Sequence, residues 1–388
     1  MTALSSRRRR RTLLMLLTTV LVIGAVPALG YVGVRAILDS EGGADAIAEN
    51  LPITTFPSTP TGLLVTNNGA GRMTSTTVFV LDPKGVGGSI ISVPVSADFG
   101  LADDARQSLQ GAYDVGGFDG AVDAVESLLG ITVNVSAELD PSGLAALLAP
   151  LAPIPVDLPG NVPAEGAIGE IPAGSGELTA EQAARVLTAS PPEGGTGLEA
   201  SRRPNVESTW VGVVRAVGDG KANASGDITQ IPTTFDELAS RLFSGKVQTR
   251  GLTVQALTPE QNPTGVDVEQ LDRSEEVFVF ASIAPGSMSP SAIGPTFRLV
   301  APPGYDAAMK LTIGKLLFFQ GNVVSVDTTG AEHPDTVFLV PDEIVRSEAQ
   351  QTDAIFGDIT FGDPTERIDG IDITIMLGTD YLSKAVPT

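Results

Sequence analysis

An arginine cluster followed by a long uncharged stretch limits what this chain can fold into. Arg7 to Arg11 are five consecutive arginines, and no charged residue occurs from Thr12 to Val34. A helix over 12–34 would rise by roughly 35 Å, enough to cross a hydrocarbon core of about 30 Å. Clustered arginines remain on the cytoplasmic side of a membrane. The sequence therefore predicts a cytoplasmic basic tail at 1–11, a transmembrane helix at 12–34 and a single-pass cell-membrane protein whose bulk is extracytoplasmic.

A cleaved secretory signal is the alternative interpretation of the same segment. Small residues near Ala28 and Gly30 could form the cleavage site, but the apolar core would exceed the usual length of about 7–15 residues. The anchor is therefore favoured, and both interpretations export the rest of the chain.

The charge distribution agrees with an exported chain and excludes several functions. All 46 acidic residues follow Leu38, and six of the 24 basic residues precede Ala36, so residues 36–388 carry 18 minus 46, or −28. Such a chain repels nucleic acid, whose phosphates need clustered lysine and arginine, and no nucleic-acid partner is expected. The absence of cysteine excludes disulfides, thiolate nucleophiles and thiolate metal ligands.

Composition divides the exported part into a linker and folded domains. The predicted segments are a stalk linker at 35–60, a first domain at 61–217, a connecting region that completes or follows it at 218–295, and a last domain at 296–384. Prolines oppose regular structure in the stalk. The small and polar stretch Gly218 to Asp227 and the proline-containing stretch Thr258 to Val268 predict sparse contacts within the connecting region.

Hydrophobic periodicity predicts the α/β class for both domains. In the first domain, β-prone runs predict strands at Leu63–Thr66, Thr76–Leu81, Ser89–Val95 and Ile131–Val135, and helical spacing predicts helices at Gly120–Leu129, Pro141–Leu151 and Thr179–Leu187. In the last domain, the predicted strands are Phe297–Val300, Val323–Val326, Thr336–Val340 and Asp372–Leu377, and the predicted helices are Tyr305–Phe319 and Asp342–Phe356. Strands that alternate with helices of this length favour helices packed on a sheet.

Residues in these elements resemble the LytR-CpsA-Psr family of Gram-positive and actinobacterial envelope proteins. The matching pieces over much of 61–215 are Asp82-Pro83 after a strand, Ile91-Ser92-Val93-Pro94, Ala112-Tyr113-Asp114-Val115-Gly116-Gly117, and Val125-Glu126-Ser127-Leu128-Leu129-Gly130-Ile131. Residues 296–382 separately resemble the LytR C-terminal domain, through Arg298-Leu299-Val300, Gly321-Asn322-Val323-Val324 and the ending Ile371 to Tyr381. The resemblance implies an LCP-like α/β domain followed by a smaller α/β LytR C-terminal domain.

The same resemblance implies transfer of a glycopolymer from a polyprenyl-pyrophosphate carrier to peptidoglycan. Arginines would hold the pyrophosphate and carboxylates would hold magnesium, which suits a hard cation and an anionic leaving group. This sequence departs from the family pattern at the site. Arg-Asp after Ser92-Val93-Pro94 is replaced by Val95 and Ser96, and the Asp of an earlier Asp-Thr pair is replaced by Thr76. These changes predict a degenerate relative without catalysis.

A third part of the family pattern, Arg-x-x-Arg-Gln, falls near Arg202 to Glu207. Arg202 or Arg203 can take the first arginine position, whereas Asn205 or Val206 stands at the second. Loss of several charge-assisted contacts to a pyrophosphate would leave little transfer activity. The positions without the family residue are therefore Thr76, Val95, Ser96, Asn205 and Val206.

A displaced site is the alternative for the missing groups. Neighbouring charged residues could rebuild the pyrophosphate and metal contacts, and the candidates are Asp98, Asp103, Asp104, Arg72, Arg106, Arg202 and Arg203. No cofactor is expected, and magnesium is implied only if this alternative holds. The simpler interpretation of these charges is a solvated loop.

Other candidate chemistry is weaker. His333 is the only histidine and cannot build a zinc site without further ligands. The glycine-rich run Asn67 to Arg72 lacks the order of a phosphate-binding loop and predicts a turn. Trp210 is interpreted as core or tunnel wall rather than a sugar platform. The leucine-rich segment Gly143 to Leu158 predicts core packing, with the wall of a lipid groove as the alternative.

Three functions remain open from the sequence. The favoured one is an envelope-anchored protein of cell-wall glycopolymer assembly that binds polyprenyl-pyrophosphate-linked precursor, peptidoglycan or an active LytR-CpsA-Psr paralogue without catalysis. The second is an active phosphotransferase with a displaced site, and the third is a structural or sensing scaffold. Each includes a membrane partner through the single anchor.

Overall fold

A computed structural model describes residues 51–102, 105–190, 198–341, 343–357, 359–364 and 366–385. The transmembrane helix predicted at 12–34 lies outside these residues. Within the described ranges, no helix combines the length and apolar character that a membrane span requires.

A five-stranded mixed sheet, formed by strands within residues 61–250, has the order β10-β4-β3-β2-β7. Its strands are β2 (Thr61–Asn67), β3 (Met73–Leu81), β4 (Gly88–Val93), β7 (Val135–Leu139) and β10 (Val247–Arg250). The central strands β2, β3 and β4 are antiparallel neighbours, while β7 runs parallel to β2 and β10 runs parallel to β4. The region 218–295 thus contributes an edge strand to this sheet.

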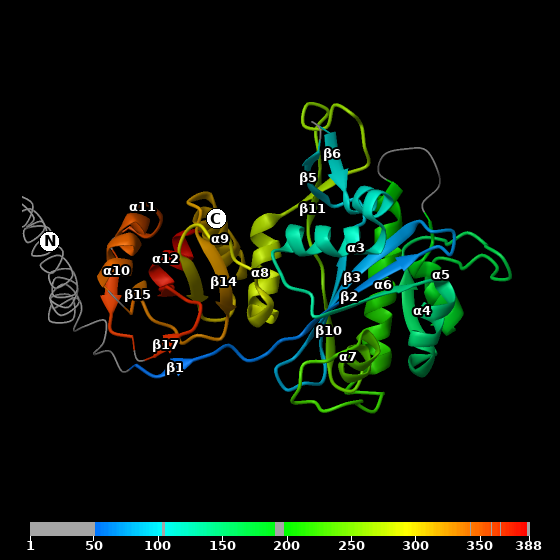
Figure 1. Cartoon of the computed structure of the whole chain (residues 1–388), viewed down its shortest axis with the longest axis horizontal. Helices are drawn as coiled ribbons and strands as arrows, with labels where there is room; N and C mark the ends of the chain where they lie inside the picture. The colour runs from blue at the N-terminus through cyan, green and yellow to red at the C-terminus, as the bar shows by residue number, and fades with distance from the viewer. Residues whose placement is uncertain are drawn as a thin grey trace, which may run out of the picture. The chain divides into compact units, whose positions relative to one another are not determined.

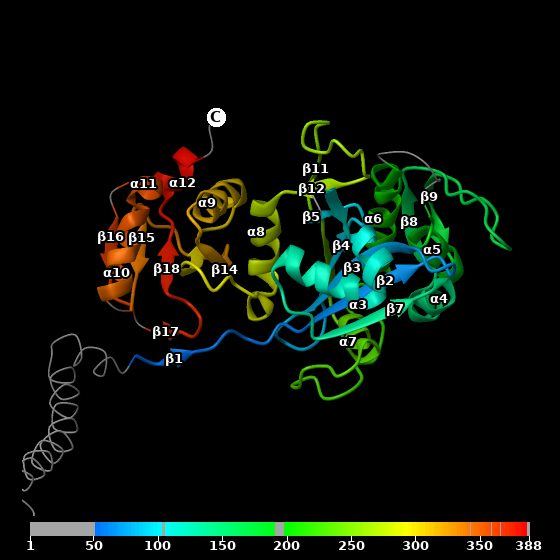
Figure 2. The ribbon, with the colours of Figure 1, turned by 45° about the horizontal axis from the view of Figure 1, so that its top comes forward.

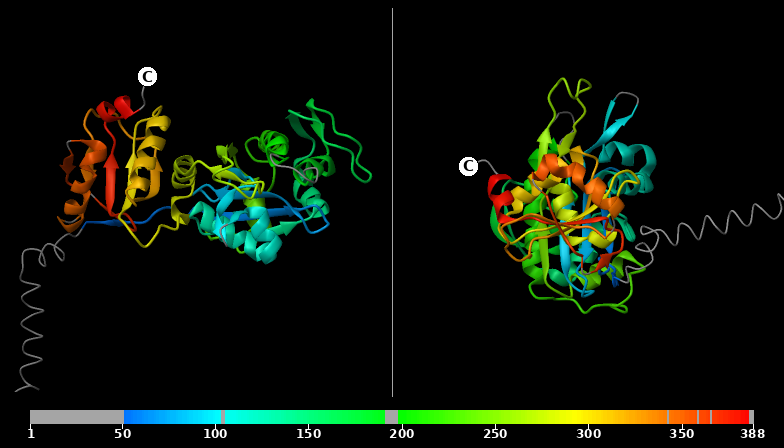
Figure 3. Two further views of the ribbon diagram at one scale, coloured as in Figure 1. Left: turned by 90° about the horizontal axis from the view of Figure 1, so that it is seen from above. Right: turned by 90° about the vertical axis from the view of Figure 1, so that its left-hand side faces the viewer.

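Helices cover both faces of the first sheet, because alternate side chains of its strands point to opposite sides. The helices are α3 (Leu109–Leu129), α4 (Pro141–Leu148), α5 (Ala180–Leu187), α6 (Leu198–Val217), α7 (Phe235–Leu242) and α8 (Arg273–Ile283). Leu63 and Val65 of β2 share one apolar cluster with α3 and α8 residues, whereas Leu64 and Phe79 share the other with residues of α4, α5, α6 and α7. Figure 1 labels these elements, and Figure 3 shows α3 and α6 on opposite sides of the strand layer.

Local sequence signals explain several boundaries of the elements around the first sheet. The β2–β3 turn has positive φ at Gly69 and Gly71, which only glycine adopts readily, and the Asn68 side chain accepts from the Ala70 and Arg72 amides. Thr179 and Gln182 form a capping box at the start of α5. Gly130, in the left-handed conformation, ends α3.

A second five-stranded sheet, formed by strands within residues 296–376, has the order β14-β13-β18-β15-β16. Its strands are β13 (Thr296–Val300), β14 (Asn322–Asp327), β15 (Val337–Leu339), β16 (Thr360–Gly362) and β18 (Ile373–Met376). The helices are α9 (Asp306–Phe318), α10 (Glu343–Ala349), α11 (Asp353–Phe356) and α12 (Thr379–Ala385), and Figure 2 shows them beside this sheet. The predicted mixed α/β class is confirmed.

Short strands complete the described chain. They are β1 (Ile53–Thr54), β5 (Asp98–Ala102), β6 (Ala105–Ser108), β8 (Ile154–Leu158), β9 (Gly174–Leu178), β11 (Val254–Ala256), β12 (Glu269–Leu271) and β17 (Arg367–Ile368). Single-turn 3₁₀ helices follow α4 at Ala149–Leu151, α8 at Pro285–Ser287 and α10 at Gln350–Thr352.

Some predicted elements differ from the structure. The strand predicted at Ile131–Val135 is wrong in position. Ile131 makes only an isolated bridge to Met288, and the strand β7 begins at Val135. The helix predicted from Gly120 instead begins at Leu109 and is kinked at Gly117. The single helix predicted at Asp342–Phe356 is divided into α10, a 3₁₀ turn and α11, with Asp342 itself outside the described residues.

Candidate functional site

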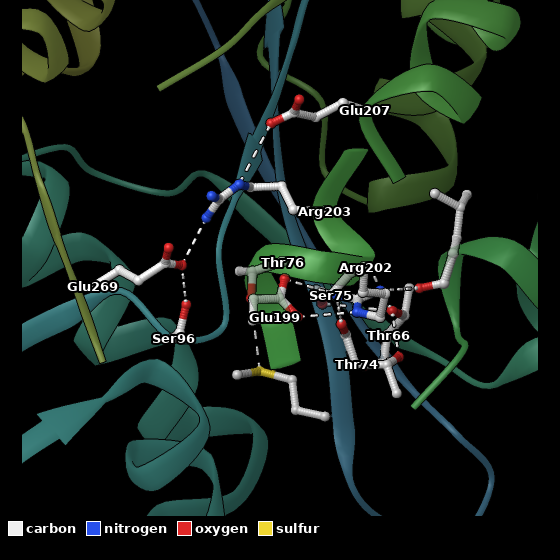
Figure 4. Close-up of polar contacts among 12 residues, drawn as sticks. Thr66, Thr74, Ser75, Thr76, Ser96, Glu199, Arg202, Arg203, Glu207 and Glu269 are labelled. Atoms are coloured by element: carbon white, nitrogen blue, oxygen red, sulfur yellow. Dashed lines mark hydrogen bonds and ion pairs between the residues drawn. The ribbon is translucent and has the colours of Figure 1, made fainter. Parts of the chain in front are cut away.

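The family positions gather at one end of the first sheet. Thr76 of β3 lies opposite Val93 at the end of β4, and Val95 and Ser96 follow this strand. Arg202 and Arg203 lie on α6, which packs against the same sheet (Figure 4). The candidate site is therefore the set of side chains around the start of β3, the segment after β4 and the first turns of α6.

Arg202 is a buried arginine whose polar contacts are all internal. Its guanidinium forms two hydrogen bonds to the Glu199 carboxylate, at 2.9 Å each. It also donates to the Thr74 carbonyl oxygen and, at 3.4 Å, to the Leu187 carbonyl oxygen. Arg202 is 8% exposed and Glu199 is 4% exposed. Because each guanidinium nitrogen already donates within the protein, Arg202 joins α6 to β3 and has little to offer a ligand.

Arg203 is paired with a carboxylate that sequence analysis did not identify. Its Nη1 lies 2.6 Å from Oε2 of Glu269, while its Nε lies 3.9 Å from Oε1 of Glu207. Ser96 donates its hydroxyl to the same Glu269 oxygen at 2.7 Å. Burial raises the pKa of Glu207, the Arg203 charge opposes this rise, and the Glu199 charge adds to it. The structure thus places a carboxylate beside Ser96, where the family pattern has its own aspartate.

Glu269 reaches the site through a short strand far along the chain. It begins β12, its amide donates to the Ser96 carbonyl oxygen at 2.8 Å, and it bridges Ala97. Ser96 and Glu269 are 173 positions apart in the sequence. The only sequence signal was one acidic residue beside apolar Val268 and Leu271, which does not indicate the partner.

Asp98 and Arg106 form a separate ion pair across the β5–β6 hairpin. Arg106 Nη1 lies 2.8 Å from Asp98 Oδ2, and Arg106 Nε donates to the Gln261 carbonyl oxygen. The Asp98 side chain is 5% exposed, so the pair satisfies its own charges. Asp103 and Asp104, the other carboxylates of this candidate group, lie outside the described residues.

Arg72 lies in the β2–β3 turn and is exposed. Its backbone amide donates to Asn68, and within the described ranges its guanidinium has no ion-pair partner. The structure therefore brings Arg106 to Asp98, and it brings Arg202 and Arg203 to Glu199 and Glu269 instead.

Thr76 of β3 and Val95 after β4, two of the positions without the family residue, have structural surroundings. Thr76 is fully buried and its hydroxyl donates to the Met73 sulfur at 3.7 Å. Val95 is 7% exposed and belongs to the apolar cluster on the α3 side of the sheet.

The two replaced residues on α6 are structural as well. Asn205 Oδ1 accepts from the Gly160 amide at 3.0 Å, which ties α6 to the loop after β8. Val206 is buried in the cluster on the other face of the sheet.

Magnesium does not fit these residues. The hard cation needs several oxygen ligands with net negative charge. Here one carboxylate, Glu269, approaches Ser96, and its Oε2 already accepts from both Ser96 and the Arg203 guanidinium. A guanidinium at 2.6 Å would repel a divalent cation bound to the same oxygen. The described residues contain no group of three or more His, Cys, Asp or Glu placed to hold a metal ion.

The remaining sequence candidates have structural surroundings. His333 Nδ1 lies 2.5 Å from the Asp335 carbonyl oxygen in a turn. Trp210 is 1% exposed and contacts Phe79 edge to face, with ring centroids 5.7 Å apart, as the core interpretation predicted. In the segment 143–158, the core interpretation is also confirmed for four fully buried residues, Leu144, Leu148, Leu151 and Ile154.

Comparisons with known proteins give matches among solved structures. No family model matches the sequence, and no curated protein matches it. TagV of Bacillus subtilis is 20% identical, with 57% of this chain and 94% of that chain covered and a TM-score of 0.39. TagT of the same organism is 16% identical, with 57% and 88% covered and a TM-score of 0.41.

A further match is a structure of TagT named as a LytR-CPS2A-psr family protein with bound octaprenyl pyrophosphate lipid. It is 16% identical, with 56% of this chain and 86% of that chain covered and a TM-score of 0.38. The residues of this chain must decide what its site can do.

Proposed function

We propose that this chain is an envelope-anchored LytR-CpsA-Psr-like protein that acts in cell-wall glycopolymer assembly by binding, without catalysing transfer. In this proposal residues 12–34 anchor the chain, 61–217 with 218–295 form the LCP-like domain, and 296–384 form a LytR C-terminal-like domain. The ligand is a polyprenyl-pyrophosphate-linked precursor or an active paralogue. The sequence motifs that resemble the family support this assignment.

One observation carries the absence of catalysis: three of the four candidate arginines, all except Arg72, are already neutralised by carboxylates of the same chain. Arg106 pairs with Asp98 at 2.8 Å, Arg202 with Glu199 at 2.9 Å and Arg203 with Glu269 at 2.6 Å. Phosphoryl transfer needs cationic groups aimed at charge that develops on the leaving diphosphate. Guanidinium groups held by carboxylates do not provide that field, so a bound diphosphate would remain intact.

The displaced-site phosphotransferase has one observation in its favour. Glu269 restores a carboxylate beside Ser96, and Arg203 lies next to it. The two groups neutralise each other's charge, so Arg203 is not free to stabilise the charge that develops on a leaving diphosphate. The displaced-site function therefore stands second.

Turnover by the full-length chain distinguishes these functions. We expect the chain, mixed with polyprenyl-pyrophosphate-linked glycan, magnesium and peptidoglycan, to retain lipid without forming polyprenyl monophosphate or glycan-bearing peptidoglycan. Chromatography of the lipid products and of the digested wall measures both. Appearance of these products with this chain alone would establish the phosphotransferase. If the chain retains no lipid and forms no product, the function as a structural or sensing scaffold remains.

Removal of the Glu269 charge should strengthen pyrophosphate binding at this site. In Glu269→Gln, Arg203 loses its carboxylate partner, so we expect affinity for a short polyprenyl pyrophosphate to rise about tenfold, the value of roughly one charge-assisted contact. Glu207→Gln is the matched control, because Glu207 lies 3.9 Å from Arg203 and is 48% exposed. Calorimetric titration measures both variants. Equal affinities for the wild type and Glu269→Gln would show that Glu269 does not restrain Arg203.

A further inference from the structure

The outward side of α9 exposes large apolar side chains. Leu311 is 45% exposed and Phe318, seven residues later on the same side of the helix, is 82% exposed. Phe319, which directly follows the helix, is 55% exposed. The inward side is also apolar, because Met309 and Ile313 are buried in the apolar cluster. A helix that is apolar on both sides is normally covered on both, so the exposed side of α9 indicates a contact with another surface.

A hydrogen-bonded turn fixes the backbone beside the two exposed rings. The Gln320 amide donates to the Leu317 carbonyl oxygen at 3.0 Å, and the Gly321 amide donates to the Leu316 carbonyl oxygen at 2.9 Å. Gln320 has a φ of 61°, so the turn is a Schellman cap with glutamine in the left-handed position. The two phenylalanine rings contact each other edge to face, with centroids 5.4 Å apart. The end of α9 therefore presents both rings from a defined backbone.

A neighbouring loop adds one more apolar side chain to this surface. Asn322 Nδ2 donates to the carbonyl oxygens of Ile293 and Gly294, at 2.8 and 3.2 Å. A Cβ atom on Gly294 would lie 2.0 Å from the Gln320 carbonyl oxygen, so the loop lies directly against the turn that ends α9. Ile293 is 69% exposed. The four exposed apolar residues are named here the α9 patch: Ile293, Leu311, Phe318 and Phe319.

The size of the α9 patch does not suit a stable interface between two copies of the chain. With about 150–250 Å² for a whole aromatic side chain, the exposed fractions of its four members amount to on the order of 400–500 Å². A stable protein interface buries about 800 Å² on each partner. Exposed apolar patches of this smaller size are nevertheless often functional on single protein molecules.

A short tether makes a small contact sufficient at a membrane. In the proposed anchoring through residues 12–34, the segment 35–50 alone separates the anchor from the described chain. Fully extended, such a segment spans at most about 55 Å, which keeps the folded chain close to the lipid surface. The anchor then supplies a high effective concentration, so a weak second contact with lipid is populated without a partner protein.

The charges on α9 also suit the headgroup region of a bilayer. Lys315 is exposed on the same side of α9 as Leu311 and Phe318, with its Nζ 5.5 Å from the centre of the Tyr381 ring. A lysine stem can lie along apolar groups while its ammonium reaches the lipid headgroups. The acidic residue of α9, Asp306, is in the first turn, at the opposite end of the helix from the exposed rings.

We propose that the α9 patch inserts into the headgroup region of the membrane that anchors the chain, and so holds the second sheet at the lipid surface. The proposal rests on the anchor of the proposed function, but it does not depend on the chemistry of the candidate site. The partner is the lipid bilayer itself, and the contact is burial of the Phe318 and Phe319 rings.

A spin label on the α9 patch measures its depth in a membrane. The sequence contains no cysteine, so Phe318→Cys provides a single attachment site. The labelled full-length chain is reconstituted in vesicles of phosphatidylcholine and phosphatidylglycerol, and flotation on a density gradient reports the anchor. Arg215→Cys, an exposed position on α6, is the matched control. We expect the ratio of oxygen to nickel-chelate collisions to be several-fold higher at 318 than at 215, because lipid admits oxygen and excludes the polar chelate.

Replacement of the other patch residues tests whether they cause the insertion. With the label at 318, Leu311→Ser combined with Phe319→Ser should lower the collision ratio toward the value at 215. Both replaced side chains are about half exposed, and circular dichroism checks that the variant folds. Ile231→Ser is the matched control, because Ile231 is 53% exposed in a loop outside the α9 patch, and it should leave the ratio unchanged.

Each other outcome rejects a defined part of the proposal. If the chain floats but the label at 318 meets the chelate as often as the label at 215, the anchor stands and the patch contact is rejected. Spin–spin broadening between labels at 318 would reject lipid as the partner in favour of a second copy. A chain that does not float with the vesicles lacks the tether, which rejects the anchor and the patch contact together.

Discussion

Replacement of Glu199 by alanine is expected to destabilise the protein by about 3–5 kcal/mol, the cost of removing one partner from a buried ion pair. Arg202 would remain 8% exposed, with its guanidinium facing the Thr74 and Leu187 carbonyl oxygens but without a counter-charge. Neither solvent nor another described carboxylate within 4 Å can replace Glu199. The loss should therefore appear as a lower denaturation midpoint measured by tryptophan fluorescence, for which Trp210 of the same helix is the reporter.

A neighbouring glutamate on the same helix provides the control. Glu207 is 48% exposed and lies 3.9 Å from Arg203, so Glu207→Ala should cost less than about 1 kcal/mol. The double replacement Glu199→Leu with Arg202→Met removes both charges and should recover much of the lost stability. If Glu199→Ala unfolds at the same denaturant concentration as Glu207→Ala, the pair is not a stabilising element.

Much of the architecture was predictable because it depends on local patterns. The β-prone runs Leu63–Thr66 and Thr76–Leu81 predicted β2 and β3, and the helix predicted at Thr179–Leu187 matches α5. The strand expected at Ile131–Val135 shows the limit of this reasoning. Its composition suits a strand, but pairing with β2 begins only where Val135 meets Gly62, so the partner strand decides the register.

The candidate site was less predictable because its charges are paired across long sequence separations. The family resemblance identified Arg203 as a candidate, but the residue that neutralises it, Glu269, comes from a three-residue strand 66 positions away. Arg202 pairs instead with Glu199, one helical turn before it. A list of charged residues near a motif cannot distinguish a guanidinium available to a ligand from one used by the fold.

Glu276 is expected to make the stability of this protein fall as pH rises from about 4.5 to about 8. Its side chain, on α8, is 2% exposed and is held by Arg273. Burial raises its pKa to about 8; the Arg273 charge opposes the rise, and the Asp272 charge adds to it. At a pH between the pKa of Glu276 in the unfolded state and its pKa in the folded state, the folded protein keeps a proton that the unfolded protein has lost. At about 1.4 kcal/mol per pKa unit, the loss approaches about 5 kcal/mol at most.

Glu276→Gln should remove most of this pH dependence, because a neutral amide has no ionisation cost and can still accept from Arg273. We expect the variant to match the wild type near pH 4.5 and to exceed its unfolding free energy by several kcal/mol at pH 8, as measured by urea denaturation. For Glu275 of the same helix, we expect the effect of the Gln replacement on stability to have the opposite sign. Burial works against its ionisation, but hydrogen bonds from Lys310 and Thr253 lower its pKa, so Glu275→Gln should lose stability above the unfolded pKa. A Glu276→Gln variant that is less stable than the wild type at pH 8 would mean that the carboxylate is ionised in the fold and that Arg273 compensates its burial.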